Sequence, residues 1–96
     1  MAELYYDGLA DQALTQLEAS TDDQDRALLD RISAVLDQLA ADPGDASVRQ
    51  RRFQSGLWLV TVRGRPGEDD WALLWEPHTD APEDVMVHYV GSASFA

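Results

Sequence analysis

The sequence predicts an α+β fold, in which an N-terminal antiparallel helix hairpin packs on a three- to four-stranded antiparallel sheet. Two observations lead to this prediction: apolar residues recur at helical spacing up to about residue 41, and from about residue 48 the period changes to that of strands. The length of 96 residues is that of one domain, residues 1–96. Hydrophobic residues make up 45% of the chain, which favours a globular fold over a disordered one.

Two apolar stripes in the first half predict the helices. The first stripe predicts a helix over about residues 8–19, with Asp7 as its N-cap. The second stripe is wider and predicts a helix over about residues 23–41, which ends before Pro43 because proline cannot continue a helix. An acidic turn between them indicates an antiparallel hairpin. The segment Leu4–Tyr6 is either a brief edge strand or a lead-in to the first helix.

Runs of β-branched and aromatic residues in the second half predict the sheet. They indicate strands over about residues 57–63, 71–76 and 85–90, and an alternating segment indicates a further strand over about 48–53. Polar loops with glycine or proline separate the last three, as is typical of antiparallel neighbours. Because the strands are apolar on both faces, we expect the helices to cover one face and a site or partner to occupy the other. An exposed apolar face would predict a homodimer or a complex.

The charge is unevenly distributed. The formal net charge is −11, and eleven of the 18 acidic residues lie in residues 1–45, whereas five of the seven arginines follow them; the chain has no lysine. An acidic surface repels phosphate at long range and so disfavours casual nucleic-acid binding. Two interpretations remain: the charge keeps the protein soluble, or the arginines act at close range against this background.

Several classes of site and location are excluded or disfavoured by the sequence. There is no cysteine, which rules out disulfides and thiolate metal sites, and the spacing of His78 and His88 matches no recognised metal-ligand pattern. No phosphate-binding loop, dinucleotide-binding turn or nucleophile elbow is found. No apolar run approaches the roughly 18–20 residues that cross a bilayer, and the N-terminus does not resemble a secretory signal. We therefore expect a cytoplasmic protein with no membrane contact, no metal and no cofactor.

The arginines of the second half form the one basic group. Guanidinium groups bind phosphates or carboxylates in a bidentate manner, so these side chains are candidates for binding RNA or an acidic partner. Alternatively, they balance the acidic residues of the loop that follows Gly67. The residues concerned are Arg49, Arg51, Arg52, Arg63 and Arg65.

Aromatic residues and a histidine complete the candidates. Trp58, Trp71 and Trp75 would form a base-stacking platform if they were exposed, and are ordinary core or interface residues otherwise. His88 and Tyr89 are candidates for proton transfer, and simple alternation places them on opposite faces of the last strand. The alternative is a hydrogen-bonded structural histidine.

The order of elements and several short motifs resemble one known family. The motifs are Asp30-Arg31-Ile32, Leu39-Ala40-Ala41-Asp42-Pro43, Gly56-Leu57-Trp58, Trp71-Ala72-Leu73-Leu74-Trp75-Glu76 and Val87-His88-Tyr89-Val90-Gly91. With a helix hairpin followed by an antiparallel meander, they resemble the RelE/ParE superfamily of toxins from bacterial toxin–antitoxin modules, including its HigB-like branch.

The resemblance implies a compact microbial ribonuclease fold and a cognate antitoxin, or another protein, bound across the sheet. In its ribonuclease members, basic and aromatic side chains on the sheet promote cleavage of ribosome-bound mRNA. On this basis Arg63, His88 and Tyr89 are the candidates for catalysis, and the remaining arginines and the tryptophans are candidates for binding. These binding candidates are Arg49, Arg51, Arg52, Arg65, Trp58, Trp71 and Trp75.

Three positions depart from the family pattern. Thr61, Ala72 and Ala93 stand where many members carry a cationic side chain, and metal-independent cleavage needs a group that neutralises the phosphorane. Three hypotheses follow. The chain is a RelE/ParE-like toxin that cleaves mRNA or inhibits by protein contact, a catalytically inactive acidic interaction or inhibitor module on the same scaffold, or an unrelated small α+β binding domain.

Overall fold

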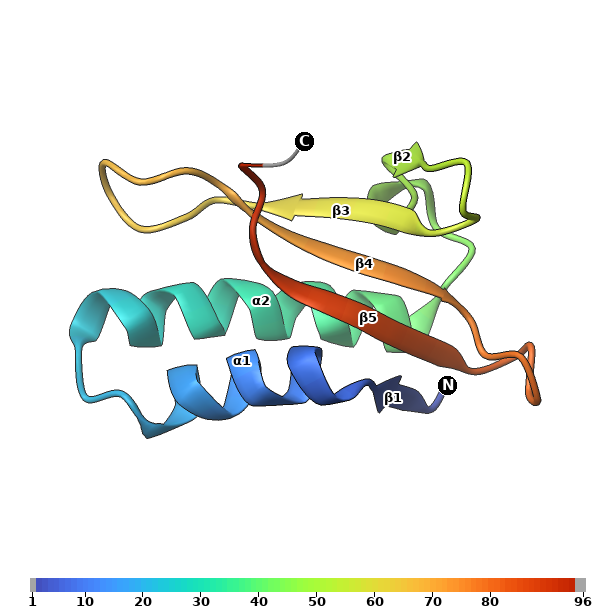
Figure 1. Ribbon diagram of the computed structural model, residues 1–96, viewed down its shortest axis with the longest axis horizontal. Helices are drawn as coiled ribbons and strands as arrows, with labels where there is room; N and C mark the ends of the chain where they lie inside the picture. Colours follow the sequence, from blue (N-terminus) through green and yellow to red (C-terminus); the bar gives the residue numbers. More distant parts are fainter. Residues whose placement is uncertain (1, 95–96) are drawn as a thin grey trace.

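A computed structural model describes residues 2–94, in which two helices lie along one face of a five-stranded sheet (Figure 1). The α+β class predicted from the sequence is confirmed. The elements are β1 (Leu4–Tyr6), α1 (Gly8–Ala19), α2 (Asp23–Ala41), a short 3₁₀ helix η1 (Ala46–Val48), β2 (Arg51–Arg52), β3 (Trp58–Val62), β4 (Trp71–Pro77) and β5 (Val85–Ser92).

Both helices begin and end where the sequence predicts, because their N-caps act locally. The Asp7 carboxylate accepts a hydrogen bond from the backbone N–H of Ala10 at 3.2 Å. The Asp22 carboxylate accepts from the N–H groups of Gln24 and Asp25 at 2.8 and 3.1 Å. Each aspartate thus satisfies N–H groups that have no partner in the first helical turn.

The sheet is mixed, with the strand order β1-β5-β4-β3-β2. Strands β2 to β5 are antiparallel neighbours in chain order, whereas β1 pairs in parallel with β5, with Leu4 opposite Val85. The predicted antiparallel sheet is found in β2 to β5, and the sheet differs from the prediction in having a fifth strand, β1, that is parallel to its neighbour. Of the two alternatives for Leu4–Tyr6, the edge strand is therefore the one observed. The physical reason for the difference from the prediction is that β1 is only three residues long, and its parallel pairing depends on a contact about 80 residues away in the chain.

The predicted strand over residues 48–53 was largely wrong. The Asp45 carboxylate accepts a hydrogen bond from the N–H of Ser47 at 2.8 Å and so caps η1, which buries Val48. Only Arg51 and Arg52 then pair with β3. The local capping interaction replaces the first part of the alternating strand.

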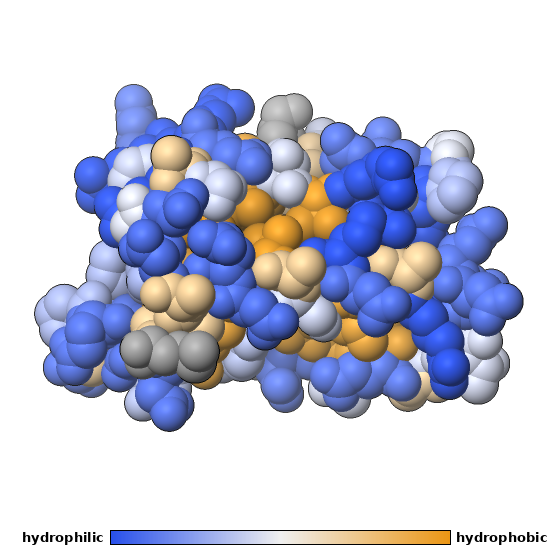
Figure 2. All heavy atoms as spheres, turned by 180° about the vertical axis from the view of Figure 1, so that it is seen from behind, coloured by the Kyte–Doolittle hydropathy of each residue, from blue (hydrophilic) through white to orange (hydrophobic). Residues whose placement is uncertain are grey.

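The main core lies between the helices and the sheet. From α2 it contains Leu28, Ile32 and Leu39, all fully buried against residues of the sheet such as Leu73 and Trp75. Seen from behind, hydrophobic residues show in separate patches near the middle of the molecule, with hydrophilic residues between and around them (Figure 2). The core residues themselves lie between the layer of helices and the sheet, as in other two-layer folds.

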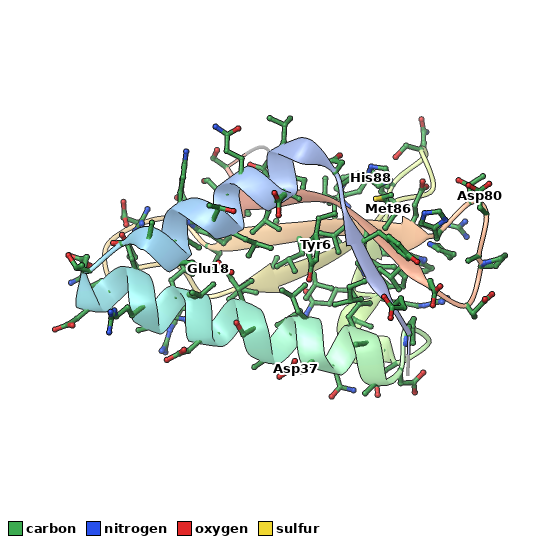
Figure 3. All side chains as sticks on the ribbon, turned by 90° about the horizontal axis from the view of Figure 1, so that it is seen from below. Tyr6, Glu18, Asp37, Asp80, Met86 and His88 are labelled. Atoms are coloured by element: carbon green, nitrogen blue, oxygen red, sulfur yellow. The ribbon has the colours of Figure 1, made fainter. Side chains whose placement is uncertain are left out.

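Tyr6 is the one described group in this layer whose ionisation the packing clearly changes. Its side chain points from β1 toward the helices (Figure 3) and packs against the core. Burial raises the pKa of the Tyr6 hydroxyl, and the negative charges of Asp11, Asp37 and Glu18 raise it further. The environment of Tyr6, on the inner side of β1, therefore disfavours the negatively charged form of its hydroxyl.

Strand β5 contains a bulge that changes the facing of its second half. Trp75 lies opposite Val87 and Leu74 lies opposite Tyr89, so His88 is an extra residue in the strand. Val87 and Val90 both belong to the core beneath the helices although they are three residues apart. His88 and Tyr89 therefore both lie on the open face of the sheet, the face away from the helices, and simple alternation placed them wrongly.

The open face is less exposed than its apolar sequence suggests. Leu59 and Ala72 are 5% and 0% exposed, respectively, and the Tyr89 hydroxyl lies 2.7 Å from the position of a Cβ on Gly91, the register partner of Ala72. Among residues 2–94, Tyr5 and Leu9 are the exposed large hydrophobic residues. The broad exposed apolar face that would indicate a homodimer is absent from this part of the chain, and the homodimer stays a prediction.

Candidate functional site

The predicted basic group divides into two groups at opposite ends of β3. Arg51 and Arg52 lie opposite Leu59 and Trp58, at the start of β3. Arg63 follows the last residue of β3, four positions beyond Leu59, or roughly 13 Å along the strand. The two groups are consequently separate surfaces, one beside β2 and one at the β3–β4 loop (Figure 1).

The first group, which we call the arginine edge, consists of Arg49, Arg51, Arg52 and the rings of Phe53 and Trp58. The guanidinium carbons of Arg49 and Arg52 lie 5.0 and 5.2 Å from the centroid of the Trp58 ring. The guanidinium carbon of Arg51 lies 5.1 Å from the centroid of Phe53. Each cation is within the distance at which the aromatic quadrupole attracts it.

The arginine edge has no carboxylate partner in the described part of the chain. Arg49 donates from Nε to the carbonyl oxygen of Pro43 at 2.7 Å, and none of the ion pairs within residues 2–94 involves Arg49, Arg51 or Arg52. Arg51 and Arg52 are exposed. In a chain with 18 acidic residues, this leaves three neighbouring positive charges uncompensated.

The tryptophans do not form one stacking platform. Trp75 is fully buried, and its indole N–H donates to the carbonyl oxygen of Val48 at 2.8 Å. Trp58 and Trp71 are half-buried and pack against the core. Trp75 therefore supports the arginine edge from beneath, at 5.5 Å from the guanidinium carbon of Arg49, and its ring is not accessible to a base.

The second group surrounds a hollow between the β3–β4 loop and α2, which we call the loop hollow. Arg65 forms ion pairs with Asp25 of α2 and with Glu68 of the loop. The hydrogen bond from Arg65 is the main cause that lowers the pKa of Asp25, and a hydrogen bond from the Ser20 hydroxyl adds to it. The same two carboxylates raise the pKa of Arg65. The sequence allowed charge balance by the acidic loop as an alternative to a binding role for the arginines. For Arg65, which pairs with Glu68 of that loop, this alternative is correct.

Arg31 also belongs to the loop hollow, although the sequence did not single it out as a site residue. It donates from Nε to the carbonyl oxygen of Arg63 at 2.9 Å and from Nη2 to that of Gly64 at 3.0 Å. The only sequence signal is a basic residue at the border of the apolar stripe of an otherwise acidic helix, three positions after Leu28. That signal does not show which loop the side chain meets.

His88 and Tyr89 are engaged in local contacts on the open face. The Nε2 atom of His88 lies 3.0 Å from Oε1 of Glu76, and its Nδ1 atom lies 3.4 Å from Oδ2 of Asp7. The Tyr89 hydroxyl donates to the carbonyl oxygen of Ser92 at 2.8 Å. Both ring nitrogens of His88 (labelled in Figure 3) thus face carboxylates, one from the N-cap of α1 and one from β4.

The three candidates for catalysis do not converge. Tyr89 lies opposite Leu74, which lies opposite Leu59, whereas Arg63 is four positions further along β3 and two strands away. The strand geometry separates the backbones of Arg63 and Tyr89 by roughly 15 Å. The two neighbouring side chains also point apart, because the Tyr89 hydroxyl reaches Ser92 whereas His88 faces Glu76 and Asp7.

Two of the three positions at which the resemblance leads us to expect cations lie side by side on the open face. Thr61 and Ala72 are register partners, and Ala72 is completely buried. The Thr61 hydroxyl donates to Oε1 of Gln50 at 2.9 Å. This part of the open face therefore carries neutral groups at both positions.

Wider comparisons add no assignment to this geometry. No protein-family model, no curated protein and no solved structure matches the chain. Among residues 2–94, no group of three or more histidine and acidic side chains has a geometry that could hold a metal ion. In the same residues, neither helix is both long and apolar enough to cross a membrane.

Proposed function

We propose that this chain is a RelE/ParE-like toxin-fold protein that acts by contact with another protein, and that an acidic segment of a partner binds at the arginine edge. A cognate antitoxin is the partner that the resemblance implies. One observation carries the proposal: Arg49, Arg51 and Arg52 have no carboxylate partner within residues 2–94, although the net charge of the chain is −11.

The geometry of the arginine edge suits carboxylates. Stacking on Phe53 and Trp58 orients the guanidinium groups of Arg51 and Arg52 and leaves their N–H edges available for bidentate hydrogen bonds. Because the rings already restrict these side chains, less conformational entropy is lost when a partner binds. An acidic segment would also gain from replacing repulsion among the three cations by attraction.

The same features argue for protein rather than RNA as the partner. With a net charge of −11, the chain repels RNA, which carries a negative charge at every nucleotide, more strongly than it repels a short acidic segment. The open face offers neutral groups at Thr61 and Ala72, and His88 lies between two carboxylates. Cleavage of mRNA therefore has less support than inhibition by contact.

The second candidate function is a catalytically inactive acidic interaction or inhibitor module on the same scaffold. It is favoured by the neutral pair Thr61 and Ala72, which removes the positive charge that the chemistry needs. This candidate uses the same arginine edge but does not inhibit growth. The two candidates are separated by the effect of the protein on a cell.

Induced expression in a bacterial host tests the proposal. We expect the unaltered chain to arrest growth, the double variant R51A/R52A to lose this effect, and the double variant H88Q/Y89F to retain it, because contact rather than proton transfer is responsible. R26A is the matched control, since Arg26 is an exposed arginine of α2 outside both arginine groups. Soluble expression of each variant is confirmed by its circular dichroism spectrum.

The reverse pattern would overturn the proposal in favour of an RNA-cleaving enzyme: growth arrest with R51A/R52A, none with H88Q/Y89F, and mRNA fragments in the arrested cells. If the unaltered chain has no effect on growth, the toxin hypothesis is excluded and the interaction module remains. For that outcome, binding of a glutamate-rich peptide followed by Trp fluorescence, lost in R51A/R52A, supports the module.

A further inference from the structure

The loop hollow has the form of a small-anion site. It has a volume of about 370 Å³ and lies between α2 and the β3–β4 loop, at the end of the molecule away from β2 (Figure 1). Three of its lining residues are Arg31, Arg63 and Arg65, and the one acidic lining residue is Glu68. The hollow thus combines a concave shape with three positive charges against one negative charge.

Arg31 is held in place before any ligand arrives. Its Nε and Nη2 atoms donate to two consecutive carbonyl oxygens, those of Arg63 and Gly64, at 2.9 and 3.0 Å. A guanidinium group has five N–H donors, so the two hydrogens on Nη1 are not used by these bonds. The group is therefore oriented by backbone atoms and keeps donors, and its charge is not neutralised by a carboxylate.

Arg63 and Arg65 contribute in different ways. Arg63 is exposed and takes part in none of the ion pairs of residues 2–94. Arg65 is bound to Asp25 and Glu68, so its single positive charge is shared between one acid inside the hollow and one on α2. The three arginines and these two carboxylates leave a net positive charge, and Arg31 and Arg63 are the arginines of the hollow that form no ion pair in the described residues.

The loop that carries these residues is closely packed against itself. A Cβ atom at Gly64 would lie 2.0 Å from the carbonyl oxygen of Asp69, so the two backbones are in direct contact. Gly67 has a φ of +79°, which permits the turn in which the N–H of Glu68 donates to the carbonyl oxygen of Arg65 at 3.0 Å. A loop closed in this way holds the backbone of Arg63 and Arg65 in place, which lowers the cost of ordering the loop when a ligand binds.

We infer that the loop hollow binds a small oxyanion of the phosphate monoester class, held by Arg31 and Arg63. Guanidinium forks match the oxygens of phosphate, and at physiological salt the distant acids of the chain are screened beyond about 8 Å. Asp69 and Asp70 follow directly in the loop, so a longer polyanion would be repelled where a small one is not. This site is separate from the arginine edge and does not depend on the proposed function.

Titration of the ¹⁵N-labelled full chain with inorganic phosphate, at constant ionic strength maintained with chloride, tests the inference. We expect saturable amide shifts confined to the loop, with Gly64 and Gly67 foremost. R63A should bind phosphate about tenfold more weakly than the unaltered chain, because a charged hydrogen-bond partner is removed. R31K keeps the charge but loses the fork and should also weaken binding. R26A and R51A/R52A are the controls and should bind as the unaltered chain does.

Two results would overturn the inference. One is a set of shifts that increase linearly without saturation, or that are equal at every arginine. The other is unchanged phosphate affinity in R63A, whose spectrum reports whether the exposed substitution leaves the fold intact. Stronger binding of a short oligoribonucleotide or of succinate than of phosphate would contradict the assigned ligand class. Loss of phosphate binding leaves the growth assay of the arginine edge unaffected, so the two proposals fail separately.

Discussion

The arginine edge and the loop hollow both contain arginine side chains, but the two regions hold these side chains in different ways. At the arginine edge, Arg51 and Arg52 lie on aromatic rings, and their charges are unmatched in the described residues. In the loop hollow, Arg31 is bound by carbonyl oxygens and Arg65 by carboxylates, although the guanidinium carbon of Arg65 also lies 5.7 Å from the centroid of the Trp71 ring. Rings attract a cation without consuming its donors, whereas oxygens orient a cation by using some of them.

This difference in anchoring is the basis of the two binding proposals. Stacked, exposed arginines on an edge strand form a surface that an extended acidic segment can reach. Arginines fixed by backbone oxygens around a hollow form a site of limited size. The comparison therefore predicts different effects of substitution in the two regions. At the exposed arginines of the arginine edge, a substitution should weaken binding with little loss of stability. In the loop that closes the hollow, a substitution should lower both stability and binding.

The largest expected effect concerns the ring beneath the arginine edge. W75A should lower the free energy of unfolding by about 3–5 kcal/mol, because it removes a fully buried aromatic side chain and leaves a cavity. Denaturant unfolding measures the change. W71A, at a half-buried tryptophan near the other end of the sheet, should cost clearly less. Equal losses would contradict the view that Trp75 is the support of this edge.

The next effect concerns the closure of the loop hollow. G64A places a Cβ against the carbonyl oxygen of Asp69, so we expect a loss of about 1–3 kcal/mol and weaker phosphate binding. G8A is the matched control, because a Cβ at Gly8 meets no atom within 4 Å. Thermal unfolding and phosphate titration of both variants provide the test. A neutral G64A would show that the loop is not tightly closed.

A smaller effect on stability is expected at the arginine edge itself. R51A and R52A should each change the free energy of unfolding by no more than about 1 kcal/mol, since cation–π contacts at exposed positions are weak. R49A should cost more, because Arg49 also loses its hydrogen bond to Pro43. Denaturation curves of the three variants check the order. A large loss in R51A or R52A would assign these residues to the fold rather than to binding.

The smallest effect is a dependence of the loop hollow on pH. The pKa of Asp25 is lowered in the folded protein, so its contribution to stability is present above the ordinary aspartate value and is lost as the pH falls through the lowered one. Amide shifts of the loop, followed during acid titration, should show this step. R65Q removes the main cause and should move the step back toward the ordinary value. An unchanged step in R65Q would contradict the role of this ion pair.

Part of the open face could have been anticipated from the sequence. Val85 and Val87 are two positions apart in the sequence, whereas Val87 and Val90 are three positions apart. This break in alternation is the signal of the bulge at His88. The facing of Tyr89 follows from the same break. The partners of His88 could not be anticipated, because Asp7 and Glu76 come from distant parts of the chain.

The sequence by itself determined the α+β class, the bounds of α1 and α2, and the three central strands β3, β4 and β5. These features depend on caps, apolar periodicity and turns, which act over a few neighbouring residues. Only the tertiary structure decided the parallel pairing of β1, the division of the arginines between two surfaces, and the place of Arg31 beside the loop. Such contacts depend on which elements approach one another when the whole core is buried, and no local pattern encodes that approach.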